Sequence, residues 1–275
     1  MKMTGEAPKR DSYHHGDLRN ALVEAALRLV STKGVQGFSL RETAREVGVS
    51  PAAAYRHFQD KAALLTALGI DGMGRLATAM EEAIARAPGA PGSPARAVAE
   101  MAAIGAAYVE FAVAWPAHFR VMFGPWCEHP ELAALPPGVL PGGRDPYEIM
   151  VDCLDAMVRS GAITADARRG AEVAAWASVH GLASLLVEES LPLGPVERAQ
   201  ALGVIVRTLF AGLGVAPELL GATGGRAQRV GVSRALDAIL SERHAPRAEV
   251  TEAPGGHGGV RRAAAGGRRR QRRLG

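Results

Sequence analysis

One short segment, residues 39–58, constrains the fold of this chain more than any other. Ser39 and Glu42 stand three residues apart and match a capping box, which predicts the start of a helix. Gly48 ends that helix after about two turns, because glycine adopts the left-handed turn conformation without a Cβ penalty. A serine directly before Pro51 then predicts the start of a second helix, with proline at its first helical position. Two short helices joined by a tight turn are typical of a helix-turn-helix.

A third helix is predicted directly before this segment. Apolar positions recur at helical spacing from Asp17, and Lys33-Gly34 supplies a cation and a glycine at its end. Asp60 predicts the cap of the next helix. We therefore expect a three-helix head over residues 17–70, with the helix-turn-helix at about 39–58.

The rest of the chain is rich in alanine and predicts helices almost throughout. No segment alternates convincingly as a strand, so the expected fold class is all-α, with the head followed by a helical ligand-binding and dimerisation bundle over residues 71–215. We expect helices near 60–86, 95–115, 117–123, 144–160, 166–190 and 195–213. Outside the two domains we expect a flexible arm at 1–16, a possible extra helix within 216–245 (through 226–243) and a disordered Arg/Gly-rich tail at 246–275.

The charge is unevenly distributed along the chain. Residues 1–61 hold ten Lys/Arg and seven Asp/Glu, residues 62–260 hold 15 and 21, and residues 261–275 hold seven arginines and no acid. A basic head, an acidic body and a basic tail indicate that the two ends of the chain meet polyanions.

Composition also argues against several classes of protein. The apolar stretches are interrupted well short of the about 18 residues that a membrane span needs, and the start of the chain has no apolar signal segment. A cytoplasmic location and no membrane partner are expected. With only Cys127 and Cys153, we expect two reduced, partly buried thiols and no disulfide framework.

The predicted helix-turn-helix suggests how DNA would be bound. Its second helix would enter the major groove, where Pro51–Ala53 can offer only apolar contact with thymine methyl groups. Hydrogen-bonded recognition of a base would fall to Arg41, whose planar guanidinium suits guanine. The remaining candidates would contact phosphates and position the head. The full candidate set is Ser39, Arg41, Thr43, Ser50, Pro51, Ala52, Ala53, Tyr55, Arg56, His57 and Lys61.

Three stretches of the head resemble the TetR/AcrR family of regulators. They are Tyr13 to Arg19 (YHHGDLR), Ala44 to Pro51 (AREVGVSP) and Ala54 to Lys61 (AYRHFQDK), and the resemblance is dense over residues 13–70. Ala54 stands where the family usually has leucine, which we expect to loosen the packing slightly. Farther on, Trp176 to Gly181 (WASVHG) resembles the Trp-His-Gly subfamily of C-terminal domains.

The resemblance implies a body that dimerises through the helices near 166–190 and 195–213. It also implies an effector cavity in that body, and usually repression that a small molecule relieves. The residues agree with a dimer independently: the helix around Trp176 is apolar on most sides, and two recognition helices related by a two-fold axis would bind a palindromic duplex operator. No cofactor is expected. The ligand would be small and apolar or amphipathic.

Aromatic and methionine side chains crowd into one part of the body and suggest the pocket. Such clusters form core more often than cavity, although methionine and aromatic rings suit apolar ligands. Trp176 and His180 share one helix face, so His180 is either a pocket residue or a structural histidine. The candidate pocket set is Phe111, Trp115, Phe119, Met122, Phe123, Trp126, Trp176 and His180.

Two alternatives stay open. A helical enzyme is disfavoured because the sequence has no glycine-rich phosphate loop, nucleophile elbow or metal cluster, so no catalytic residue or metal site is expected. His14-His15 has no cysteine or acid at ligand spacing to complete a metal site. Cys127 with His129, a candidate metal or nucleophile pair, lies in a Pro-rich loop without partners. An architectural DNA-coating protein acting through the arginine tail would bind with little regard to sequence.

Overall fold

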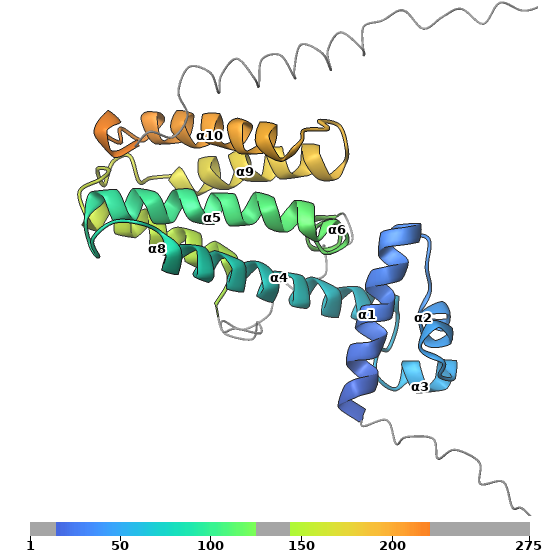
Figure 1. The fold of residues 1–275 in the computed structure, drawn as a ribbon. Coiled ribbons are helices and arrows are strands. Elements are labelled where there is room, and N and C mark those ends of the chain that lie inside the picture. Colours follow the sequence, from blue (N-terminus) through green and yellow to red (C-terminus); the bar gives the residue numbers. More distant parts are fainter. Residues whose placement is uncertain (1–14, 125–143, 221–275) are drawn as a thin grey trace, which may run out of the picture.

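The described part of the chain is all-helical, as expected, and forms a head and a body joined by one long helix (Figure 1). The structure is a computed structural model, and it describes residues 15–124 and 144–220. The head contains α1 (His15–Lys33), α2 (Leu40–Val47), α3 (Pro51–Tyr55) and the start of α4 (Lys61–Arg86). The body contains the rest of α4, α5 (Pro94–Ala114), α6 (Pro116–Phe123), α8 (Pro146–Arg159), α9 (Ala171–Val187), α10 (Pro195–Gly212) and the short 3-10 helix η2 (Pro217–Leu220).

Local capping sets the geometry of the α2–α3 pair. The side chain of Ser39 accepts a hydrogen bond from the backbone N–H of Glu42 at 3.2 Å, but the carboxylate of Glu42 binds Lys33, so only the serine half of the predicted capping box forms. Gly48 has φ 78°, the left-handed conformation predicted for the turn. The side chain of Ser50 accepts from Ala53 N at 3.2 Å and starts α3. The last predicted turn of this helix, to residue 58, is a non-helical turn.

A single apolar core holds the head helices against α4 and α6. One cluster contains four side chains that are at most 3% exposed: Leu22 of α1, Leu40 of α2, Leu64 of α4, and Phe58, which lies between α3 and α4. Burying side chains of this size stabilises by roughly 1.5–3 kcal/mol each. The cluster also includes Ala117 and Val121 of α6, so a helix of the body completes the core of the head.

The body helices begin and end close to the predicted residues, with one exception. The helix predicted over 166–190 is shorter, because Gly170 is left-handed (φ 76°) and precedes α9, and residues 165–170 form turns. Glu189, also at positive φ (55°), follows the other end. The 3-10 helix η2 was not expected.

Helix α5 departs from the expectation that no apolar stretch is long enough to cross a membrane. By length and composition it passes that test, and half of its apolar stretch is buried within the protein. It packs against α4, α8 and α9, so it is the central helix of the body. Cys153 is buried and unpaired in the same core, and burial raises the pKa of its thiol to about 12.

Several sequence expectations fall outside the described residues. They concern the arm up to residue 14, Trp126, Cys127, His129, the possible helix over 226–243 and the tail at 246–275.

Candidate DNA-binding surface and ligand cavity

The head exposes one continuous face of α2 and α3. Arg41 projects from the first turn of α2, and Pro51 and Ala52 form the exposed N-terminal turn of α3. Tyr55 at the end of α3 is 45% exposed. The exposed members of the candidate set are Ser39, Arg41, Ser50, Pro51, Ala52, Tyr55 and Arg56.

Two candidates are buried, and their expected contact with DNA is corrected. Thr43 is 0% exposed, and its hydroxyl donates to the backbone carbonyl of Ser39 at 3.0 Å. Ala53 is 8% exposed, because three successive residues of one helical turn cannot all face outward. Both residues therefore shape the α2–α3 pair from within. His57 is partly buried.

Lys61 lies at the start of α4 and contacts the segment between α1 and α2. Its ammonium donates to the backbone carbonyl of Gln36 at 3.3 Å and sits 4.6 Å from the ring centroid of Phe38. Partial burial lowers the pKa of Lys61. An ammonium has three donors, so one bond to Gln36 leaves donors for a phosphate.

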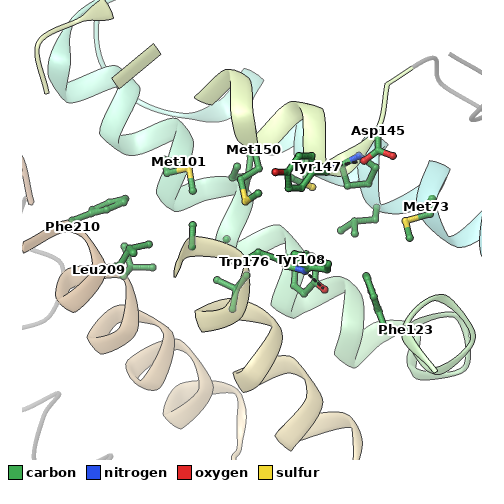
Figure 2. Close-up of a pocket in the computed structure, with 18 residues that line it drawn as sticks. Met73, Met101, Tyr108, Phe123, Asp145, Tyr147, Met150, Trp176, Leu209 and Phe210 are labelled. Carbon is green, nitrogen blue, oxygen red and sulfur yellow. Dashed lines mark hydrogen bonds between the residues drawn. The ribbon is translucent and has the colours of Figure 1, made fainter. Parts of the chain in front are cut away.

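The body contains a largely apolar cavity of about 290 Å³ (Figure 2). It extends from Met73 and Asp145 at one end to Leu209 and Phe210 at the other, with Tyr108 and Trp176 between them. Helices α4, α5, α8, α9 and α10 all supply lining residues, and Phe123 contributes from the end of α6. Four methionines are among the lining residues: Met73, Met80, Met101 and Met150.

The sequence identified only two of these lining residues, Phe123 and Trp176. Phe111, Phe119 and Met122 are buried in the body core, and none of them lines the cavity. Trp115 lies elsewhere, 42% exposed, with the guanidinium of Arg75 5.0 Å from its ring centroid. Methionines recurring on the inner faces of α4, α5 and α8 were the missed signal, since methionine suits adaptable apolar sites.

His180 lies behind the cavity wall and belongs to a polar chain of three side chains. Its Nδ1 is 2.8 Å from the hydroxyl of Tyr108, which also accepts a hydrogen bond from Trp176 Nε1 at 3.4 Å. The imidazole stacks on Phe119 with centroids 5.4 Å apart. Burial lowers the pKa of His180 and raises that of Tyr108, which favours the neutral form of both groups. His180 is therefore a structural histidine that holds the cavity-lining Tyr108 and does not itself line the cavity.

Comparison with known proteins identifies both parts of the chain. Residues 22–68 match the family described as bacterial regulatory proteins, tetR family, and residues 101–209 match the tetracyclin repressor-like C-terminal domain. The chain belongs to the TetR family of transcriptional regulators. It is therefore a DNA-binding regulator with a helix-turn-helix, and the family is not enzymatic.

The relatives of this TetR-family chain agree with that assignment. Over 49 residues it is 47% identical to the HTH-type transcriptional regulator BetI of Rhizobium meliloti, a match that covers 18% of this chain and 24% of BetI. The curated relatives are thus matched over about a quarter of their length or less. A solved protein of unknown function from Rhodococcus sp. RHA1 is 33% identical, with 74% of this chain and 99% of that chain covered and a TM-score of 0.59. The fatty acid degradation regulator FadR from Bacillus halodurans shares the fold at 17% identity, with 76% and 97% covered and a TM-score of 0.53.

Two helices of this TetR-family regulator connect the cavity to the head. Helix α4 supplies Leu64 to the head core and the cavity-lining Leu76 to the body core. Helix α6 supplies Val121 to the head core, while its neighbour Met122 belongs to the body core.

The two connecting helices are fastened to each other where the head meets the body. The ring of His118, 0% exposed on α6, is bonded to Asp71 of α4, with Nε2 and Oδ2 2.9 Å apart. The next residue of α4, Gly72, has no side chain, and a Cβ there would lie 2.5 Å from the sulfur of Met122. A side chain at this position would therefore require the buried side chain of Met122 to shift.

Proposed function

We propose that this protein is a homodimeric repressor that binds a palindromic operator in the cytoplasm and is released by a small apolar or amphipathic molecule bound in the body cavity. The observation that carries the proposal is that α6 belongs to both cores: Val121 packs in the head, and Phe123 lines the cavity. We also propose that the C-terminal domain belongs to the Trp-His-Gly subfamily, because Trp176 lines the cavity and His180 is hydrogen-bonded to the Tyr108 hydroxyl.

The exposed face of α2 and α3 supports separate roles for residues that contact bases and residues that contact phosphates. Arg41 would form paired hydrogen bonds with a guanine, and Pro51 and Ala52 would contact thymine methyl groups. Tyr55 and Arg56 would bind phosphates, which position the head without selecting a sequence. One α3 of five residues offers few base contacts, so a second copy is needed for a specific site.

Helix α9 supports dimerisation. Its residues Ala174, Ala177, Gly181 and Leu185 are all exposed, follow one another at helical spacing and carry no charge. Leu185 is 45% exposed, and Val196 at the start of α10 is 65% exposed. Small residues permit close approach of a second helix, and a two-fold axis would place the same face of each copy together.

Release follows from the connection between cavity and head. A ligand that displaces Phe123 would move α6, and the His118–Asp71 bond would carry that displacement to α4 and the head. The spacing of the two α3 helices in the dimer would then no longer match successive major grooves. This coupling requires the ligand to bind more tightly to the released state than to the DNA-bound state.

The test is release of DNA measured with a variant that fills the cavity. A duplex selected from random DNA by the full-length protein is followed by fluorescence anisotropy while small molecules are screened for release. Gly105 lines the cavity, so Gly105→Leu should bind the duplex normally but resist release by any active molecule. The matched control, Ala103→Leu, changes a neighbouring residue of α5 that does not line this cavity and should be released as the wild type is.

Two outcomes would contradict the proposal. If Gly105→Leu released DNA at the same ligand concentrations as the wild type, the effector would bind somewhere other than this cavity. The architectural alternative would be favoured instead if the full-length protein bound DNA with no preference for sequence and lost all binding on deletion of the arginine-rich residues 261–275.

A further inference from the structure

In the part of the chain that the structure describes, no cationic side chain lines the cavity to compensate an anionic ligand. Among the described residues that line it, none is lysine, arginine or histidine, and the one charged side chain is the acidic Asp145. Asp145 caps α8, and its Oδ1 accepts from the backbone N–H of Tyr147 at 2.6 Å. A carboxylate buried among these residues would lose its hydration without gaining a cation, which disfavours its binding. The cavity therefore selects against acids.

The hydrogen bonds of the polar chain leave one acceptor position on Tyr108, a residue that lines the cavity. Trp176 Nε1 donates to the Tyr108 oxygen, so the arrangement that gives the buried Tyr108 proton an acceptor is donation to His180 Nδ1. The imidazole then carries its proton on Nε2. A hydroxyl oxygen has two lone pairs, and one of them is left on Tyr108 after the bond from Trp176. Tyr108 thus keeps one acceptor position for a further hydrogen bond.

Size and lining restrict the ligand further. A dry cavity of about 150 Å³ holds benzene, and this cavity, at about 290 Å³, has roughly twice that volume. Thioethers pack well against aromatic rings, and four methionines line the walls beside Trp176. A flat molecule of two fused rings fits these constraints.

We propose, on the basis of the ligand-released function above, that the cavity binds an uncharged aromatic molecule of about two fused rings with one hydrogen-bond donor, such as a hydroxyl, directed at the oxygen of Tyr108. The donor fixes the orientation of the ligand, and the methionines and Trp176 enclose its rings. The same cavity rejects the equivalent carboxylic acid.

Calorimetry with three matched probes tests this chemistry on the full-length protein at pH 7. The probes are 2-naphthol, naphthalene and 2-naphthoate, which share one ring system and differ only in the polar group. We expect 2-naphthol to bind about five- to tenfold more tightly than naphthalene, as one net hydrogen bond implies. We expect 2-naphthoate to bind at least about 100-fold more weakly than 2-naphthol. Binding of 2-naphthoate as tight as that of 2-naphthol would overturn the proposal.

Two variants locate the donor contact. Tyr108→Phe should remove the preference for 2-naphthol and leave the affinity for naphthalene within about twofold, so naphthalene binding reports that the cavity is intact. The control Ser178→Ala removes a hydroxyl on α9 that donates to Ala174 O. Ser178 does not line the cavity, so this variant should keep the preference for 2-naphthol. Retention of the preference in Tyr108→Phe would overturn the assignment of the acceptor.

DNA binding measured in parallel separates the two proposals. If the protein binds its selected duplex but none of the three probes, the ligand class is wrong and the DNA-binding function is unaffected. If 2-naphthol binds with the expected preference but fails to release DNA, the cavity chemistry holds and the ligand-released function fails.

Discussion

His118 of α6 and Asp71 of α4 form a hydrogen bond of 2.9 Å at the boundary between the head and the body. The histidine is fully buried, whereas the side chain of Asp71 is 37% exposed and also binds Arg75 at 2.6 Å. Each partner belongs to a helix that supplies residues to both cores, so this bond joins the two helices that connect the cavity to the DNA-binding surface.

The Asp71 contact should make stability depend on pH. The hydrogen bond from His118, assisted by Arg75, lowers the pKa of Asp71 below its ordinary value of 3.8. A carboxylate with a lowered pKa stabilises the fold above its unfolded pKa, and this contribution disappears as the pH falls through its folded value. Asp71→Asn should therefore lower the free energy of unfolding by about 1 kcal/mol near pH 6, after allowance for solvent screening.

Urea unfolding of wild type and Asp71→Asn between pH 6 and pH 3 measures this difference. The gap between the two proteins should narrow below about pH 4. The control is Glu82→Gln, which breaks an exposed pair with Arg86 on the same helix and should have little effect. A gap that stays constant with pH would show that the charge of Asp71 contributes nothing.

Arg41→Ala should weaken binding to the operator by about 1–3 kcal/mol and binding to random duplex by much less. The reason is that Arg41 is exposed at the start of α2, where its guanidinium can bind the edge of a base. Anisotropy titrations on both duplexes measure the two losses. Arg86→Ala, which removes another exposed arginine, at the end of α4, is the control. Equal losses on the two duplexes would reassign Arg41 to a phosphate.

Lys61→Ala should weaken binding to every sequence and reduce the slope of log K against log salt by about one unit. The ammonium of Lys61 keeps donors for a phosphate while it holds the carbonyl of Gln36. Titrations over a series of salt concentrations measure the slope, with Lys33→Ala as the control because Lys33 is paired with Glu42. An unchanged slope with weaker binding would mean that Lys61 acts only by positioning the head.

Leu185→Glu should shift the protein from dimer to monomer. The substitution places a charge on the exposed apolar face of α9, where a partner copy would have to bury it. Sedimentation equilibrium measures the shift, and circular dichroism shows that the helices are retained. Thr78→Glu, at an exposed position of α4, should leave the association unchanged. A dimer of unchanged strength in Leu185→Glu would place the interface elsewhere.

The head could be predicted from sequence because its determinants are local. Ser39, Gly48 and Ser50 each act within four residues of their own position, and the structure has them in the predicted capping and turn conformations. Exposure within the head was harder to predict: Thr43 and Ala53 lie on the two helices that we propose face DNA, but only packing decides that they point inward.

The cavity could not be predicted to the same degree because its walls come from six helices far apart in sequence. The aromatic cluster around Phe119 suggested a pocket, but Phe111, Phe119 and Met122 fill the core, and among its described members only Phe123 lines the cavity. Tyr108 and Met150 were not identified, since on a single helix an inward-facing side chain that lines a cavity has the same pattern as one that fills the core.

The central claim is that two copies of α3 enter successive major grooves of one symmetric site. Binding-site selection from random duplex DNA with the full-length protein at physiological salt, followed by sedimentation of the complex, tests it most directly. The account predicts an enriched palindrome with half-sites about one helical turn apart, or a multiple of it, bound by an even number of protein copies. Recovery of unenriched DNA, or of a complex with a single copy on an asymmetric site, would contradict it.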